Sequence, residues 1–424
     1  MPNFYKDKTP LMLLLFFLMI GFVAFSNGVV DSILGNYYKE VYNVTPVQRG
    51  FIEIPRELPG ILCSFFFALL SFLSDIKVTL VGSILAVIGL FCLGMFTPSF
   101  MVMMVFLFIH SIGMHLATPL SDAICMDLSE PDKVGARMGQ YVSVKSAAAF
   151  LASLLVFLGF RSGIFTFSSE KKIIFFVAMA AYFFACVMCV IISVKKKQSK
   201  ASGAKSVRFI FRKHYLFYYT LTTLHGVQKQ IALVYGSWVV IDILMKGADT
   251  IALLLITSSF ICTFIMRYVG RMIDRFGIKN MLFFEALFFI GVYSMYGATV
   301  WAIDSGPFGS NGFSVFLVYI FFVLDRMSMQ LGMIKAVYMR SIAIDAAEIT
   351  STLSTGITLD HILSLPAAMV GGYIWAQWGS HWVFLMAALF SFGNLFVAWK
   401  VNPEKEIENA QKIRNAQKNS DLEL

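Results

Sequence analysis

An almost uninterrupted apolar run followed by three lysines occupies residues 172–197, KIIFFVAMAAYFFACVMCVIISVKKK. About 20 mostly apolar residues suffice for one α-helix to cross the hydrocarbon core of a bilayer. The run therefore predicts a membrane-spanning helix. The lysines predict its cytoplasmic end, because short basic loops stay on that side of a membrane.

The rest of the chain shares this apolar character. Its 424 residues are 58% hydrophobic and 14% charged, with a mean hydropathy of +0.75. Soluble globular proteins carry about 25% charged residues, so this composition argues against a soluble enzyme and excludes a disordered chain. The net charge of +9 gathers in short segments between apolar runs and forms no basic face, so we expect no nucleic-acid partner.

Apolar runs bounded by charges, prolines and glycine clusters predict an all-α membrane protein with twelve transmembrane helices in two pseudo-symmetric six-helix bundles. The predicted spans are 11–37, 47–71, 78–96, 100–122, 136–160, 172–193, 215–243, 250–269, 281–302, 313–337, 350–376 and 382–400. The predicted domains are an N-terminal bundle 1–193, a basic cytoplasmic linker 194–213, a C-terminal bundle 214–401 and a cytoplasmic tail 402–424.

The positions of the basic residues predict the orientation of the chain. With both termini inside the cell, most of the lysines and arginines of the connecting segments fall on the cytoplasmic side. We therefore expect a multi-pass protein of the cell membrane, plasma or inner, with cytoplasmic termini. Its surroundings are then the lipid bilayer, and we expect a monomer.

Three short local matches, in the same order in both halves, indicate that the six-helix unit is duplicated. The matching stretches are 27–28 with 225–226, 71–75 with 270–274, and 130–134 with 345–349.

Residues 270–279, GRMIDRFGIK, fall in the predicted cytoplasmic loop after the second span of the second half. They resemble the G-x-x-x-D-R-x-G-x-R/K signature of the major facilitator superfamily, which has this loop at the same place. The positions that carry the resemblance are Gly270, Asp274, Arg275, Gly277 and Lys279, with Asp75 as the remnant in the first half. The resemblance implies a secondary transporter that works by alternating access between two six-helix halves.

Ionisable side chains inside spans are costly and mark cavities or relays by default. Asp31 in the first span and Lys229 in the seventh occupy equivalent repeat positions with opposite charge, as do Lys145 in the fifth and Asp360 in the eleventh. In the family's fold these spans are neighbours. We therefore predict two ion pairs, Asp31–Lys145 and Lys229–Asp360, around a central cavity. The alternative is that both are structural bridges between helices.

The second span carries four charges and two prolines within residues 49–60, RGFIEIPRELPG. Each proline removes a helical donor and favours a kink. Arg56 and Glu57 fall near the middle of the membrane, where we predict contact with an ionic substrate. The alternative is that they are charges of the outer vestibule that water solvates. Arg49, at the outer end beside Glu53, is interpreted as a charge solvated by water in the outer vestibule.

Other polar side chains complete the candidate site. His110 and His115 share a span but not a helix face, so they predict hydrogen bonds in a cavity and no zinc site. Whether one of them titrates during transport is left open. Adjacent Asp325 and Arg326 are expected to point in different directions. His225 belongs to a polar turn suited to substrate contact.

Together these residues predict a transporter that moves a small polar or charged solute by symport with a proton. The candidates for substrate contact or proton coupling are Asp31, Arg56, Glu57, His110, His115, Lys145, His225, Lys229, Asp325, Arg326 and Asp360. Asp31, Glu57 and Asp360 are the candidate proton switches. We expect no catalytic residue, no metal and no cofactor besides the coupling proton. The alternatives are an exporter of drugs or metabolites by antiport, and a membrane sensor that binds a ligand without transporting it.

Overall fold

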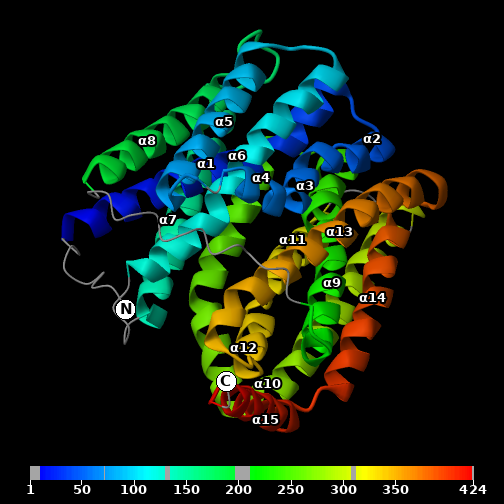
Figure 1. Ribbon diagram of the computed structural model, residues 1–424. Coiled ribbons are helices and arrows are strands. Elements are labelled where there is room, and N and C mark those ends of the chain that lie inside the picture. The colour runs from blue at the N-terminus through cyan, green and yellow to red at the C-terminus, as the bar shows by residue number, and fades with distance from the viewer. Residues whose placement is uncertain (1–9, 71, 129–133, 196–210, 307–311, 423–424) are drawn as a thin grey trace. The chain divides into compact units, whose positions relative to one another are not determined.

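The computed structural model describes the chain except for residues 1–9, 71, 129–133, 196–210, 307–311 and 423–424 (Figure 1). The described residues form helices and connecting turns and contain no β-strand. Nine helices in these residues are long and apolar enough to cross a membrane. The predicted all-α membrane fold is therefore confirmed. Most of the predicted basic linker, and most of the repeat match at 130–134, lie outside the described residues.

Each predicted span of the first half falls on helix in the described chain. The elements are α1 (Pro10–Tyr42), α2 (Pro46–Phe51), α3 (Glu53–Ile61), α4 (Cys63–Leu69), α5 (Asp75–Met95), α6 (Phe100–Asp127), α7 (Val134–Arg161) and α8 (Ile173–Lys195).

The second half also matches its predicted spans, with one 3-10 turn, η3, and two π-helical segments, η4 and η5. The elements are η3 (Lys213–Tyr215), α9 (Leu216–Gln230), η4 (Ile231–Gly236), η5 (Val239–Ile243), α10 (Ala248–Asp304), α11 (Phe313–Gln330), α12 (Met333–Ser341), α13 (Ala346–Trp378), α14 (His381–Lys400) and α15 (Pro403–Leu422).

The second predicted span is broken into α2, α3 and α4. It starts at a capping box, in which the Thr45 hydroxyl accepts from the Gln48 amide (3.3 Å) and the Gln48 side chain accepts from the Thr45 amide (3.0 Å). Pro55 and Pro59 both lie in α3, where each removes one main-chain donor from the helical ladder. Single turn residues, Ile52 and Leu62, separate α3 from α2 and α4, and the kink expected from the prolines stays a prediction.

The family-like stretch forms a bend and not a separate loop. Gly277 has φ +79° and ψ 160°, a conformation open to glycine, and it divides α10 into the spans predicted at 250–269 and 281–302. The prediction of a loop here is wrong in detail, because helix continues on both sides of this one glycine. Gly270 and Asp274 belong to the helical part before the bend.

Two basic residues of the same stretch, Arg275 and Lys279, make contacts near the surface. The Arg275 guanidinium lies over the ring of Phe276, 5.4 Å from the centroid, and Lys279 donates to the main-chain oxygen of Trp399 (3.3 Å). In the first half, exposed Asp75 begins α5. A carboxylate in the first turn of a helix is favoured by the helix dipole.

Contacts divide the chain into two compact units. Unit 1 contains Met1–Val44, Pro55–Ser206 and Lys246–Phe260, and unit 2 contains Thr45–Ile54, Val207–Met245 and Ile261–Leu424. Each unit therefore includes one short segment from the other half of the sequence. In the second span the chain changes unit at Pro55, the first of the two prolines of α3.

In unit 1, α1 packs against α7 and α8, and α5 packs against α6 and α8. Glycines allow α5 and α6 to approach closely. A Cβ on Gly113 would lie 2.4 Å from the Gly82 carbonyl oxygen, and one on Gly89 would lie 2.6 Å from the His110 main-chain nitrogen. The second contact fixes the position of His110 on α6.

In unit 2, α13 packs against α9 and α2. Glycines again permit the contact, because a Cβ on Gly226 would lie 2.6 Å from the Asp360 carbonyl oxygen and one on Gly50 would lie 2.5 Å from that of Ala368. Two helices distant in sequence are thereby held against α13.

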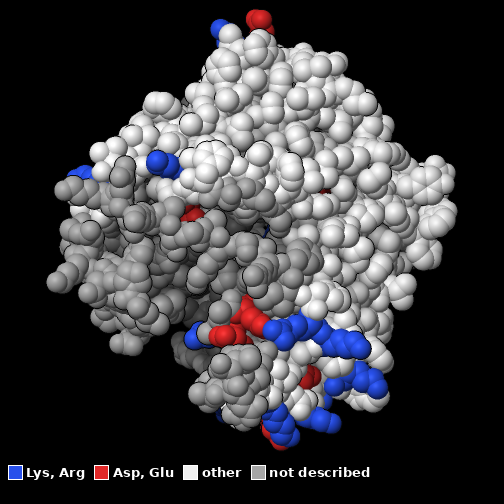
Figure 2. Space-filling view, in the orientation of Figure 1, with Lys and Arg blue, Asp and Glu red and all other residues white. Residues whose placement is uncertain are grey.

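The predicted tail contains helix α15, one side of which is buried. Ala410 is 4% exposed, and Arg414 donates to the main-chain oxygen of Ile344 (2.5 Å). On the face shown in Figure 2, charged side chains gather at α15, while the helices of unit 2 beyond it show few. Such an uncharged surface is typical of helices that face lipid.

Candidate functional site

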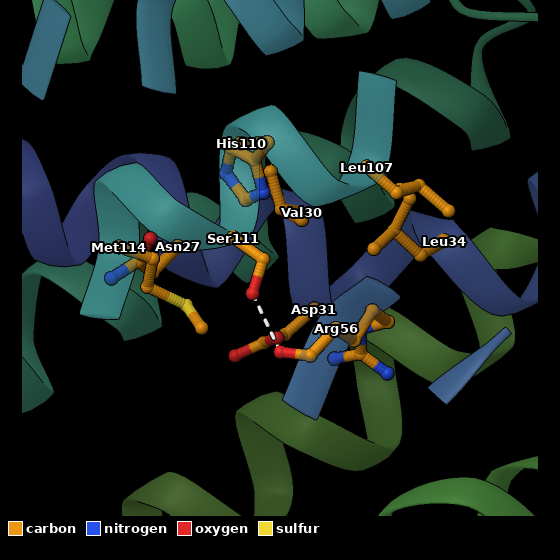
Figure 3. Close-up of a pocket in the computed structure, with 9 residues that line it drawn as sticks. All are labelled: Asn27, Val30, Asp31, Leu34, Arg56, Leu107, His110, Ser111 and Met114. Carbon is orange, nitrogen blue, oxygen red and sulfur yellow. Dashed lines mark hydrogen bonds between the residues drawn. The ribbon is translucent and has the colours of Figure 1, made fainter. Parts of the chain in front are cut away.

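Unit 1 contains a pocket between α1, α3 and α6 (Figure 3). It is lined by Asn27, Val30, Asp31, Leu34, Arg56, Leu107, His110, Ser111 and Met114. The four α1 residues and the four α6 residues each follow the spacing i, i+3, i+4, i+7, which places them on one helix face. The space between these side chains is about 320 Å³, open solvent included.

Hydrogen bonds hold the pocket walls together. The Ser111 hydroxyl on α6 donates to the main-chain oxygen of Arg56 on α3 (2.5 Å), as the dashed line in Figure 3 shows. The Tyr182 hydroxyl on α8 donates to the Asn27 side chain (2.7 Å), and its ring packs edge-on against His110. These bonds join α6 to the main chain of α3 and α8 to the Asn27 side chain of α1.

The pocket combines opposite charges with apolar walls. Asp31 from α1 and Arg56 from α3 line the same space, together with the buried imidazole of His110. Among the described residues, no group lies within hydrogen-bonding distance of His110 Nε2. The set offers a carboxylate, a guanidinium, an amide and a ring nitrogen to a small solute.

Two predicted members lie elsewhere. His115 is not among the lining residues, and its Nδ1 lies 2.9 Å from the main-chain oxygen of Ser111 on its own helix. Glu57, one residue after Arg56, is buried at 8% exposure but is not part of the lining.

The predicted pair Asp31–Lys145 is wrong for this structure. Lys145 on α7 turns toward its own helix, with its ammonium 3.5 Å from the Tyr141 hydroxyl and 4.9 Å from the Tyr141 ring centroid. Repeat symmetry places Asp31 and Lys145 on neighbouring helices but does not fix the rotation of each helix, and α1 presents Asp31 to the pocket.

The predicted pair Lys229–Asp360 is confirmed. The Lys229 ammonium on α9 donates to the Asp360 carboxylate on α13, and the two side chains are 23% and 11% exposed. Gly226, one turn before Lys229, permits the close helix approach that this contact requires. The pair joins the two helices inside unit 2.

The prediction that Arg49 is a solvated charge is wrong. Arg49 is part of a buried network. It is 4% exposed, donates to Glu53 (2.5 Å) and lies over the Trp238 ring, 6.0 Å from the centroid. Glu53 is 1% exposed and also accepts from the Gln230 amide (2.7 Å). The partners come from the second half of the chain, which local sequence spacing does not indicate.

Asp325 and Arg326 diverge as predicted. Asp325 is fully buried against α10, whereas Arg326 donates to the Ser237 hydroxyl (2.7 Å) with its guanidinium 5.1 Å from the Phe322 ring centroid. His225 packs its ring against Phe289. These side chains form the polar interior of unit 2.

A second buried pair, Glu285–Lys335, joins α10 to α12 at 2.5 Å, with both residues at most 5% exposed. Sequence reasoning did not single out Lys335. Its position could have indicated the pair, because a lysine inside a predicted span requires a partner. Among the described residues, no group of three or more His, Cys, Asp or Glu side chains could hold a metal ion.

Comparisons with known proteins agree with this architecture. The sequence matches the Major Facilitator Superfamily over residues 16–359. It is structurally similar to the nucleoside transporter NupG (TM-score 0.68, 14% identity, covering 92% of this chain and 98% of that one). It is also similar to a POT family transporter in complex with a thioalcohol-conjugated peptide (0.71, 11%, 94% and 97%) and to a D-xylose–proton symporter (0.67, 13%, 94% and 99%). No curated protein matches the sequence significantly.

The chain therefore belongs to the Major Facilitator Superfamily. It is a multi-pass integral membrane transporter, and its substrate class is small molecules.

Proposed function

We propose that this protein is a secondary active transporter that imports a small polar, charged or zwitterionic solute together with a proton. The observation that carries the proposal is the pocket of unit 1, in which Asp31 and Arg56 present opposite charges to one small space. A purely apolar drug would displace water from these two charges and offer them no polar group in return. A solute with its own charged or hydrogen-bonding groups compensates them.

Proton coupling is supported by the carboxyl groups inside the spans. Asp31, Glu57 and Asp360 are the candidate carriers, and Asp360 is held by Lys229 in this state. A carboxylate that loses its cationic partner in a low-dielectric interior takes up a proton, since burial disfavours the charged form. One structural neighbour is itself named as a proton symporter. Movement between the two states of alternating access would separate the carboxylate from its cationic partner.

The remaining parts of the proposal concern the setting. Basic residues between spans favour cytoplasmic termini in the cell membrane. We propose a monomer, because unit 1 by itself provides every wall of the pocket.

The test uses proteoliposomes that contain the full-length protein. An inward proton gradient is imposed in a mixed metabolite extract, and mass spectrometry compares the vesicle contents. Asp31→Asn removes the pocket carboxylate. The matched control is Glu404→Gln, at an exposed position of α15. We expect one class of polar solute to accumulate with the unmodified protein and with Glu404→Gln, but not with Asp31→Asn.

Each alternative has its own signature in this assay. Uptake that neither responds to nor dissipates the pH gradient excludes symport with protons. Loss of a compound from preloaded vesicles when the gradient is reversed identifies an exporter. Saturable binding of a metabolite to the purified protein without any flux identifies a sensor.

A further inference from the structure

The predicted tenth span is not one continuous α-helix, because a turn at Leu331 and Gly332 separates α11 from α12. The Leu331 amide donates to the main-chain oxygen of Ser328 (3.1 Å). The Lys335 amide likewise donates to that of Gly332 (3.2 Å). Both bonds reach back three residues instead of the α-helical four, and a short stretch of such 3-10 bonds inside a helix often marks a hinge. The pair Glu285–Lys335 fixes the hinged end of α12 to α10, so movement at this turn displaces mainly the far end of α12.

Helix α15 lies against that far end of α12 (Figure 1). Fully buried Tyr338, in the last turn of α12, donates from its hydroxyl to the Glu406 carboxylate of α15 (2.5 Å). The Arg414 guanidinium of α15 donates to the main-chain oxygens of Ile344 (2.5 Å) and Ala343 (3.3 Å). These two residues follow α12 directly. Helix α15 therefore bonds both the last turn of α12 and the chain that leaves it.

A narrow apolar stripe supplements these bonds. Ile407, Ala410 and Ile413 are spaced three residues apart, which places them on one side of α15, and they pack against the core of unit 2. The opposite side of α15 carries Glu408 and Lys412, which are exposed and paired with each other (2.6 Å). Only one face of this helix is therefore engaged with the rest of the protein.

Such a contact can open without unfolding the bundle. The Tyr338 hydroxyl, the Glu406 carboxylate and the Arg414 guanidinium all find hydrogen-bond partners in water once α15 leaves, and Arg414 is exposed even while it is bound. Few apolar side chains lose their cover. Local opening costs little free energy where few apolar contacts are buried.

We propose that α15 is a reversible, autoinhibitory clamp on the hinged half-helix α12. Docked, it holds α12 at its present angle; released, it lets α12 move at the Leu331–Gly332 turn. Conformational steps set the turnover of many proteins with moving parts, so the docked clamp slows the transport cycle. The clamp depends neither on the identity of the solute nor on coupling to a proton.

The direct test is hydrogen–deuterium exchange, read by mass spectrometry, on the full-length protein in lipid nanodiscs. One double variant, Glu406→Ala with Arg414→Ala, removes both docking bonds. The matched control, Glu408→Ala with Lys412→Ala, removes one carboxylate and one cation from the exposed face of the same helix. We expect the docking variant to exchange about tenfold faster in both α15 and residues 331–341, and the control to match the unmodified protein.

Two results overturn the clamp. Unchanged exchange in α15 shows that these bonds do not dock it. Faster exchange in α15 without a change in residues 331–341 shows that other contacts, such as His214 Nε2 at 2.9 Å from the Ile342 main-chain oxygen, suffice to hold α12. If the docking variant does not fold, Ala410→Glu disrupts the buried stripe without altering α12, and the same results are expected of it.

A second measurement separates a clamp from a structural brace. Initial rates of uptake from the metabolite extract are compared in proteoliposomes, together with the melting temperature of each variant. We expect the docking variant to transport at about twice the rate of the control or faster, because the restraint on α12 is gone. A rate at or below that of the control overturns the autoinhibitory role. If even the unmodified protein transports nothing, the proposed function fails, and the exchange measurement alone decides whether α15 restrains α12.

Discussion

The ion pair Lys229–Asp360 provides the sharpest quantitative prediction. Removing one partner of a buried pair costs about 3–5 kcal/mol, because the remaining charge loses its compensation. Lys229 is 23% exposed, so water screens part of this cost, and we expect about 3 kcal/mol for Lys229→Met, at the low end of that range. The double variant Lys229→Met with Asp360→Asn leaves no unpaired charge. The loss of unfolding free energy in the double variant should therefore be well below the sum of the losses in the two single variants.

The assay is a double-mutant cycle on reversible unfolding of the purified protein. We expect a coupling energy of about 2–3 kcal/mol, which is at the upper end for residues in direct contact. The exposed pair Glu408–Lys412 on α15 is the control, with side chains 61% and 69% exposed, and should show almost no coupling. The swap Lys229→Asp with Asp360→Lys should recover part of the transport lost in each single variant. Additive single losses, together with failure of the swap, would refute the pairing argument.

Three further predictions concern other contacts. Arg49→Met should destabilise the protein by about 3 kcal/mol in chemical unfolding, because Glu53 stays buried without its cation; a change below 1 kcal/mol contradicts this. Gly113→Val should lower the melting temperature and the yield of folded protein, because its Cβ would lie 2.4 Å from a carbonyl oxygen of α5. The control is Gly163→Ala, at an exposed glycine with no atom within 4 Å of the added Cβ, so it tests backbone strain alone. The hydrogen bond and charge of Lys412 lower the pKa of the Glu408 carboxyl below 4.5. The contribution of this contact to the stability of α15 is therefore present above pH 4.5 and is lost as the pH falls through the lowered pKa. NMR titration of Glu408 should show this, and Lys412→Met should abolish the shift.

The membrane class and the spans could be predicted because they depend on local composition. An apolar run long enough for a bilayer is visible within a single stretch such as 172–193. Repeat positions also identified Lys229–Asp360, since both residues lie where their helices face each other.

The missed contacts share one cause: their partners are far apart in the sequence. Arg49 and Glu53 meet Gln230 and Trp238, which no local spacing connects with them. Lys145 failed to pair because the rotation of α7 depends on packing with α1, and repeat symmetry does not determine it. The pocket required three helices at known rotations, so its lining could not be read from the chain.

The segment exchange between the units has a consequence for biosynthesis. Unit 1 includes Lys246–Phe260, so it is incomplete when the ribosome has finished the first six spans. Thr45–Ile54 is made early, but its partners α9 and α13 belong to the second half of the chain and are made later. The first half must therefore remain inserted in the membrane with an unfinished packing surface during most of translation. A ribosome stalled in the linker would leave a chain dependent on membrane chaperones, and two halves expressed as separate polypeptides should be stable only when made together.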